Sequence, residues 1–175
     1  MGSAMKLHLL LAALLAAVSS ALADSPQAGS PAPGFTGITQ DGHAFNLADL
    51  VGKKIVLLYF YPKDFTGGCT REACGFRDRL GDLQTNNVAV VGVSHDSVAS
   101  HKKFADAYQL NFTLVADPDG KISATYDAKM PVLGITRRVS FLIGLDGKII
   151  HVTDALNPQK HFDEMQAAIA GLKKP

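Results

Sequence analysis

Two uninterrupted apolar segments place the strongest constraint on how this chain can fold. They are Ile55–Tyr61, IVLLYFY, and Val88–Val93, VAVVGV, and the first is bounded by Gly52 and Pro62. Short apolar runs that end at glycine or proline are typical of strands. A strand with no apolar–polar alternation is buried on both faces, as in parallel sheets that are covered by helices.

The other patterns alternate strands with helices. Helical spacing over Ser97–Tyr108 puts Val98, Phe104 and Ala107 on the apolar side, with Ser97 as the cap. The remaining predicted elements are a hairpin over Phe35–Phe45 that turns at Asp41-Gly42, a strand over Phe112–Val115, a hairpin of Arg138–Leu145 and Lys148–Val152 that turns at Asp146-Gly147, and a helix over Pro158–Leu172. Alternating βα units predict a parallel core with helices on both faces, to which the last hairpin adds an antiparallel strand. We therefore predict an α/β, thioredoxin-like fold with a central mixed sheet flanked by helices.

The N-terminal segment has the pattern of a secretory signal peptide over residues 1–23. Lys6 precedes the apolar run of residues 7–18, and Ala21-Leu22-Ala23 forms a small-x-small cleavage pattern before Asp24. An uncleaved membrane anchor is the alternative, but the run is shorter than the ~20 residues that span a bilayer. The pattern predicts a bacterial protein that is periplasmic or otherwise exported, with no membrane attachment after cleavage. Residues 1–4, before the second methionine, resemble a cloning remnant. Residues 24–33 are predicted to be a flexible lead-in and residues 34–175 one domain.

Charge and cysteine content narrow the class of function. The net charge is +1 at pH 7 and there is no basic run, which argues against nucleic acid as a partner. An exported protein with two cysteines would ordinarily use them for one structural disulfide. The histidines beyond the N-terminal segment show no metal-ligand spacing with the cysteines, and we interpret them as surface or structural residues; they are His43, His95, His101, His151 and His161.

The chemistry is concentrated in the segment PKDFTGGCTREAC, residues 62–74, directly after the first apolar strand. A helix predicted over Cys69–Leu83 would place Cys69 in its first turn, where free N–H groups and the helix dipole favour a thiolate. Full ionisation of a free thiol gains only about 30-fold at neutral pH. A faster reaction of the thiolate therefore needs donors for the negative charge that develops on the leaving group, and Thr66, Arg137 and Arg138 are the candidates.

The spacing Pro62, Thr66, Cys69 resembles the peroxiredoxin signature of proline, three residues, threonine or serine, two residues, cysteine. The segments FYPKDFTGGCTREACGFRD, NFTLVADPDG and RRVSFLIGLDGKI are similar to the PrxQ subfamily, the bacterioferritin comigratory proteins, and extend the resemblance over nearly all of residues 24–175. This chain has Gly67-Gly68 where the family usually has Pro-Gly.

The resemblance implies a role for each matching residue. Cys69 would be the peroxidatic cysteine, Cys74 the resolving cysteine that forms a disulfide with it, and Thr66 the hydroxyl that orients peroxide. Arg138 would activate the reaction and Glu72 would hold that arginine, with Pro62 and Gly68 as supporting residues. The resemblance also implies a hydroperoxide substrate, a thioredoxin-like or glutaredoxin-like reductant, a monomer, and no metal or other cofactor.

Several alternatives remain open from the residues alone. Thr66 could be only a helix cap, Glu72 a solvated helix residue, and Arg137 the functional arginine in place of Arg138. The protein could also be an exported thiol–disulfide oxidoreductase or a copper-binding protein of thioredoxin fold. Those classes have other cysteine spacings, whereas four residues separate the cysteines here.

The cysteine spacing also predicts a conformational change. Residues five apart on an α-helix have Cα atoms roughly 8.6 Å apart, whereas a disulfide tolerates at most about 7 Å. A Cys69–Cys74 bond therefore requires the helix to unwind. Gly75 would ease that step by weakening the helix, so Gly75→Ala is expected to slow disulfide formation. The alternative is that Gly75 lets a neighbouring strand approach closely.

Overall fold

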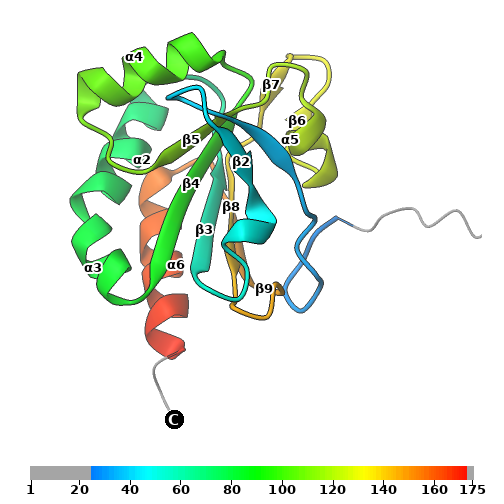
Figure 1. The fold of residues 1–175 in the computed structure, drawn as a ribbon, viewed down its shortest axis with the longest axis vertical. Coiled ribbons are helices and arrows are strands. Elements are labelled where there is room, and N and C mark those ends of the chain that lie inside the picture. Colours follow the sequence, from blue (N-terminus) through cyan, green and yellow to red (C-terminus); the bar gives the residue numbers. More distant parts are fainter. Residues whose placement is uncertain (1–24, 173–175) are drawn as a thin grey trace, which may run out of the picture.

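The computed structural model describes residues 25–172, and it confirms the predicted fold class (Figure 1). One seven-stranded sheet runs in the order β2-β1-β5-β4-β3-β8-β9, with β3, β4 and β5 parallel. Its strands are β1 Thr36–Thr39, β2 Ala44–Asn46, β3 Ile55–Phe60, β4 Val88–Ser94, β5 Thr113–Ala116, β8 Val139–Ile143 and β9 Ile149–Asp154. A separate two-stranded sheet pairs β6 Lys129–Met130 with β7 Ile135–Thr136. The helices are η1 Leu47–Asp49, α2 Gly67–Asp78, α3 Leu80–Thr85, α4 Val98–Tyr108, α5 Lys121–Thr125 and α6 Pro158–Gly171.

The central strand β3 explains why its sequence has no polar interruption. Leu57, Tyr59 and Tyr61 point to one side, where they pack in a core with residues of α2, α3, α4 and α6. Val56, Leu58 and Phe60 point to the other side, into a second core with residues of β8 and α5. Because both faces of β3 are buried, both sets of alternating side chains must be apolar.

Helices cover the two faces of the sheet unequally, which the sequence did not indicate. The longer helices α2, α4 and α6 lie on one face together with α3, whereas the short α5 and η1 cover the other (Figure 1). Both hairpins turn where they were predicted to, and Gly42 and Gly147 adopt φ values of +79° and +76°. Such positive φ values are readily accessible only to glycine.

The helix predicted over Cys69–Leu83 is divided in two. It begins earlier, at Gly67, and α2 gives way to α3 at Arg79, where φ is −98° and ψ is 0°. The Arg79 guanidinium donates to the Gly75 carbonyl at 3.0 Å and lies 4.7 Å from the centre of the Phe162 ring. The hydrogen bond ties the Arg79 side chain to α2, and the contact with the Phe162 ring holds the turn against α6.

The buried side of α4 also differs from its prediction. His101, Phe104 and Ala105 are buried, whereas Ala107 is exposed. The spacing of the buried residues is helical, but one of them is a histidine, so a count of apolar side chains misplaces the face. Ser97 caps the helix as predicted, because its hydroxyl accepts a hydrogen bond from the Ser100 N–H.

The segment predicted to be a flexible lead-in is attached to the domain over much of its length. Backbone hydrogen bonds join Gly29 and Ser30 to Ile149, and Ala32 to Gly147. The Tyr126 hydroxyl donates to the Pro33 carbonyl at 2.6 Å. Residues 29–33 therefore extend the edge of the sheet beside β9. The signal peptide predicted over residues 1–23 lies outside the described residues, and among the described helices none is long and apolar enough to cross a membrane.

Candidate active site

The loop between β3 and α2 is held in a conformation that costs energy. Phe65 has a φ of +61°, in the left-handed region, which costs a side chain of this kind roughly 1–2 kcal/mol. The next residue, Thr66, is the N-cap of α2, and its hydroxyl donates to the Lys63 carbonyl at 3.0 Å. Although Thr66 occupies the N-cap position, its side chain makes no capping hydrogen bond. Helix capping therefore does not explain why this residue is a threonine.

Cys69 lies in the first turn of α2 and is 1% exposed. Its sulfur accepts a hydrogen bond from Arg138 Nη2 at 3.3 Å. Gly68 permits this approach, because a Cβ on Gly68 would lie 3.1 Å from the same nitrogen. A Cβ on Gly67 would meet nothing within 4 Å, so this position is open at the Cβ.

Arg138 is placed immediately before β8 and joins α2 to the sheet. Its Nη1 forms an ion pair with Glu72, and the two side chains are 7% and 0% exposed. Burial raises the pKa of Glu72 to about 8, while the charge and hydrogen bond of Arg138 oppose that rise. Glu72 is therefore a buried partner of Arg138 and not a solvated helix residue.

Arg137 points away from Cys69. It donates to the Asp127 carbonyl at 2.7 Å and forms ion pairs with Asp127 and Asp154. Adjacent residues at the start of a strand face opposite sides. The structure thus brings Arg138, and not Arg137, to the cysteine.

Two polar residues behind the Arg138–Glu72 pair were not given a role by the sequence. Ser140 Oγ lies 2.7 Å from Nδ1 of His161, and His161 Nε2 lies 2.9 Å from the Ala155 carbonyl. Burial lowers the pKa of His161, which favours the neutral ring. A neutral ring with hydrogen on Nε2 satisfies both contacts, so His161 adds no charge beside Glu72. No sequence pattern distinguishes it from a surface histidine of α6.

Cys74 is on the same helix as Cys69, and both cysteines are free, with Cys74 partly exposed. The structure therefore does not hold them in a disulfide. β3 ends at Phe60, two residues before Pro62, which cannot donate to a strand ladder. Within residues 25–172, no group of three or more histidine, cysteine, aspartate or glutamate side chains is placed to hold a metal ion.

Gly75 is needed for helix packing, which corrects its interpretation as a weak point in the helix. A Cβ on Gly75 would overlap the ring of Phe162 from α6. The Phe162 ring also packs edge-on against Phe76, with 5.0 Å between the ring centres. The close neighbour of Gly75 is thus a side chain of a helix and not a strand.

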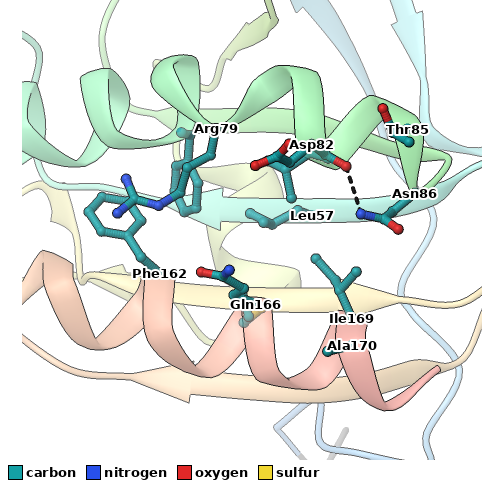
Figure 2. A pocket seen from close by; sticks show the side chains of 12 residues that line it. Leu57, Arg79, Asp82, Thr85, Asn86, Phe162, Gln166, Ile169 and Ala170 are labelled. Atoms are coloured by element: carbon teal, nitrogen blue, oxygen red, sulfur yellow. Dashed lines mark hydrogen bonds between the residues drawn. The ribbon is translucent and has the colours of Figure 1, made fainter. Parts of the chain in front are cut away.

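A hollow of about 620 Å³ lies beside this contact, between α3 and α6. Figure 2 shows Phe162 and Arg79 together at one end of the hollow. At the other end, the Asn86 side chain donates a hydrogen bond to the Asp82 carbonyl. None of Thr66, Cys69, Glu72 and Arg138 lines it. Packing between α3 and α6 is therefore incomplete at this place.

The fold and the site together define a class of protein: a thioredoxin-like domain with a buried cysteine at a helix N-terminus beside a buried arginine. The profile of the AhpC/TSA family matches residues 28–152. The chain belongs to this family, and its relatives are peroxiredoxins of the Bcp and Q type.

The relatives cover most of the chain. Peroxiredoxin Bcp of Escherichia coli K12 is 41% identical over 143 residues, which is 78% of this chain and 91% of the relative. The chloroplastic peroxiredoxin Q of Oryza sativa subsp. japonica is 36% identical, over 78% of this chain and 63% of the relative. Among solved structures, peroxidoxin BcpB of Mycobacterium tuberculosis has a TM-score of 0.81 at 29% identity, covering 85% of this chain and 99% of its own. Peroxiredoxin Q of Xanthomonas campestris has a TM-score of 0.73 at 28% identity, covering 80% and 92%.

The raised pKa of Glu72 predicts a pH-dependent stability. Between the usual pKa of 4.5 and about 8, the folded protein holds a proton on Glu72 that the unfolded chain releases. The stability from this group is complete below the usual pKa and is lost as the pH rises through the raised one. Glu72→Gln removes this titration. We expect the free energy of unfolding of the wild type, relative to Glu72→Gln, to fall by about 1–3 kcal/mol from about pH 5 to about pH 8 in urea denaturation.

Glu164→Gln is the matched control. A hydrogen bond from Thr153, together with one from His151, lowers the pKa of Glu164. Its stability contribution is therefore complete above the usual pKa and changes only at lower pH. The difference between the wild type and Glu164→Gln should stay constant over the same range. A constant difference for Glu72→Gln as well would show that Arg138 keeps Glu72 ionised throughout.

Proposed function

We propose that the protein is a thiol-dependent peroxidase that reduces hydrogen peroxide and organic hydroperoxides, with Cys69 as the peroxidatic cysteine. The observation that carries the proposal is the hydrogen bond of 3.3 Å from Arg138 Nη2 to Cys69 Sγ at the start of α2. The guanidinium stabilises negative charge on sulfur, and free N–H groups of the first helical turn act in the same direction. The peroxiredoxins among its relatives support the same activity.

The first step transfers one oxygen atom to sulfur. The Cys69 thiolate attacks the terminal oxygen of the hydroperoxide, an S–O bond forms, and the O–O bond breaks. The second oxygen leaves with the electron pair, takes a proton, and departs as water or an alcohol, and Cys69 becomes a sulfenic acid. Negative charge moves from sulfur to the leaving oxygen in the transition state, so donors that are already in place lower the barrier.

Arg138 and Thr66 are the side chains that we assign to this transition state. Arg138 lies against the sulfur through Nη2 while Glu72 holds Nη1, so the guanidinium does not need to reorganise. The Thr66 hydroxyl donates its hydrogen to the Lys63 carbonyl. Its oxygen is therefore left to accept a hydrogen bond from the peroxide. Gly68 provides the space for Arg138.

Resolution follows at Cys74. Its thiolate attacks the sulfenic sulfur of Cys69, a disulfide forms, and the oxygen leaves as water after protonation. Both cysteines lie within the continuous helix Gly67–Asp78, whose geometry separates their Cα atoms by roughly 8.6 Å, beyond the reach of a disulfide. We therefore propose that α2 unwinds locally before the bond forms. Unwinding would have to release Phe162 from Gly75 and also free the buried α2 side chains Ala73 and Phe76.

An external dithiol completes the cycle. A thioredoxin-like or glutaredoxin-like protein would attack the disulfide through a mixed intermediate and restore both thiols. We propose that the enzyme acts as a monomer, as the resemblance implies. We also propose that it acts after export, which the predicted signal peptide implies. Each step uses only the side chains described and the external dithiol.

Substitution of the two cysteines separates their roles. Cys69→Ser should abolish peroxide consumption, since Cys74 does not lie in the first turn of a helix. Cys74→Ser should react with one equivalent of peroxide, accumulate sulfenic acid, and be over-oxidised by further peroxide. Mass spectrometry and stopped-flow fluorescence would follow both variants. Normal turnover of Cys74→Ser with a thioredoxin would refute the resolving role, and full activity of Cys69→Ser would refute the proposed function.

Substitution of the two adjacent arginines tests the electrostatic argument. Arg138→Ala should slow the reaction of Cys69 with hydrogen peroxide by much more than the ~30-fold that thiol ionisation can supply, because the leaving oxygen loses its donor. Arg137→Ala is the matched control, and its rate should stay close to that of the wild type because Arg137 faces Asp127 and Asp154. Equal losses in both variants would contradict the assignment.

Amide exchange tests the unwinding of α2. We expect the amides of Thr70–Phe76 to exchange faster in the disulfide form than in the reduced protein. Gly75→Ala should also speed their exchange in the reduced protein, and speed disulfide formation with it, because the added Cβ overlaps Phe162 and separates α2 from α6. This outcome is the opposite of that expected from helix propensity alone.

Gly81→Ala provides the comparison for that prediction. Gly81 lies in α3, and a Cβ there would meet nothing within 4 Å. The substitution should stabilise the helix by about 0.5–1 kcal/mol and should not speed the exchange of Thr70–Phe76.

In the wild type, equal protection of the Thr70–Phe76 amides in the reduced and disulfide forms would show that the cysteines pair without unwinding of α2, or do not pair.

A further inference from the structure

A second buried polar cluster lies on the other side of the loop that precedes Cys69. Asp64 is 4% exposed and His101, from α4, is fully buried. The Asp64 carboxylate accepts hydrogen bonds from the Tyr61 hydroxyl at 2.7 Å and the Ser100 hydroxyl at 2.7 Å, and it lies 3.0 Å from Nδ1 of His101. Burial opposes ionisation of Asp64, but the bonds from His101, Ser100 and Tyr61 outweigh it and lower its pKa. None of these residues has a role in the chemistry proposed above.

The backbone of Asp64 is attached as well. Its N–H donates to Asp96 Oδ2 at 2.9 Å, and the same oxygen accepts the Ser94 hydroxyl at 2.7 Å. Asp64 is therefore tied by side chain and backbone to the end of β4 and the first turns of α4. Asp96, directly before the N-cap Ser97 of α4, therefore fastens this loop.

The cluster keeps a buried nitrogen without a partner. With hydrogen on Nδ1, His101 donates to Asp64, and its Nε2 is left as a buried acceptor with no hydrogen bond. An unsatisfied buried polar atom is destabilising. The histidine is kept at this cost because its Nδ1 bonds to the buried Asp64 carboxylate, so its contribution lies at that carboxylate.

The residue next to Asp64 is the strained one. Phe65 has a φ of +61°, and its ring packs against Phe104 and Tyr108 of α4, with ring centres 5.2 and 6.1 Å away. The other non-glycine residues with positive φ among residues 25–172 are Asn87, Gln109 and Asp127, so Phe65 is the one aromatic residue in this conformation. A left-handed phenylalanine persists only where its surroundings hold it, and such residues cluster at functional sites.

We propose that Asp64 and His101 are positioning residues for the peroxidase reaction, because they tie the loop to α4 and thereby hold Phe65 in its left-handed conformation and place Thr66. This inference rests on the proposed function. Cys69 is held separately, by α2 and by Arg138. If the loop relaxes, Phe65 returns to negative φ and the chain direction at Thr66 changes. The peroxide then loses its acceptor, while the sulfur keeps its guanidinium.

The first test compares two reactions of the same sulfur. Asp64→Asn should slow oxidation of Cys69 by hydrogen peroxide at least about 10-fold, the scale of a lost oriented hydrogen bond. Alkylation of Cys69 by iodoacetamide, measured in the Cys74→Ser background, needs the thiolate but not Thr66, so its rate should stay within about twofold of that of Cys74→Ser alone. Ser97→Ala is the matched control, because it removes the cap of α4 and leaves every bond to Asp64 intact. Equal losses in both reactions, or a similar loss in Ser97→Ala, would overturn the proposal.

The second test asks whether the strain at Phe65 is what Asp64 holds. Phe65→Ala and Phe65→Gly both remove the ring, but only glycine removes the strain at positive φ. In the Asp64→Asn background, the glycine variant should react with peroxide several-fold faster than the alanine variant. With Asp64 intact, the two should differ by less than about twofold. Equal rates of the two variants in the Asp64→Asn background would refute the positioning role.

Two further results complete the design. Should Asp64→Asn fail to fold, Ser100→Ala removes one of the three bonds to the carboxylate and should give a smaller loss of the same selective kind; no selective loss in Ser100→Ala would then refute the proposal. A wild-type protein that does not react with peroxide would refute the proposed function itself, and the positioning role with it. A wild type that reacts, beside an Asp64→Asn variant of equal rate, would refute the positioning role alone.

Discussion

The buried contact between Glu72 and Arg138 is the interaction on which the candidate site depends. It links α2 to the start of β8, two segments far apart in the sequence, and it presents the second guanidinium nitrogen to the sulfur of Cys69. Burial of a carboxyl group and a guanidinium together is costly, as the raised pKa of Glu72 shows, and the cost is recovered only when the geometry is good and further hydrogen bonds are present. The fold accepts that cost where a fixed positive charge meets a sulfur that must become negative. In a pre-organised site, such a charge needs no rearrangement at the moment of reaction.

The loop before Cys69 is held from a different direction. Asp64 and Phe65 are attached to α4, whereas Cys69 and Glu72 are attached to β8 through Arg138. The two anchors are independent in the chain and meet at Thr66. This arrangement separates two requirements of a peroxidase, a stabilised thiolate and an oriented peroxide, and it lets each be altered without the other.

Helix α2 meets two opposing demands in the proposed cycle. It must be helical to place Cys69 beside Arg138, and it must open for Cys69 and Cys74 to approach. Phe162 secures the helix at Gly75, where a side chain larger than hydrogen would not fit. Cys69, Ala73 and Phe76 of α2 are also buried in the core, so the opening has to expose apolar side chains as well as release Phe162.

The sequence by itself determined the class of fold and the placement of Cys69 at the start of a helix. The doubly apolar strands could be buried only in a covered sheet, and the spacing of Pro62, Thr66 and Cys69 placed the cysteine at a helix start. Only the tertiary structure decided between Arg137 and Arg138, showed that Glu72 is buried, and reversed the expected effect of Gly75→Ala. It alone brought Asp64 to His101. Local patterns report which face of an element is apolar, because side chains repeat with the period of a helix or strand. They do not report which side chain of another element packs against that face. Ion pairs and close approaches depend on that distant side chain.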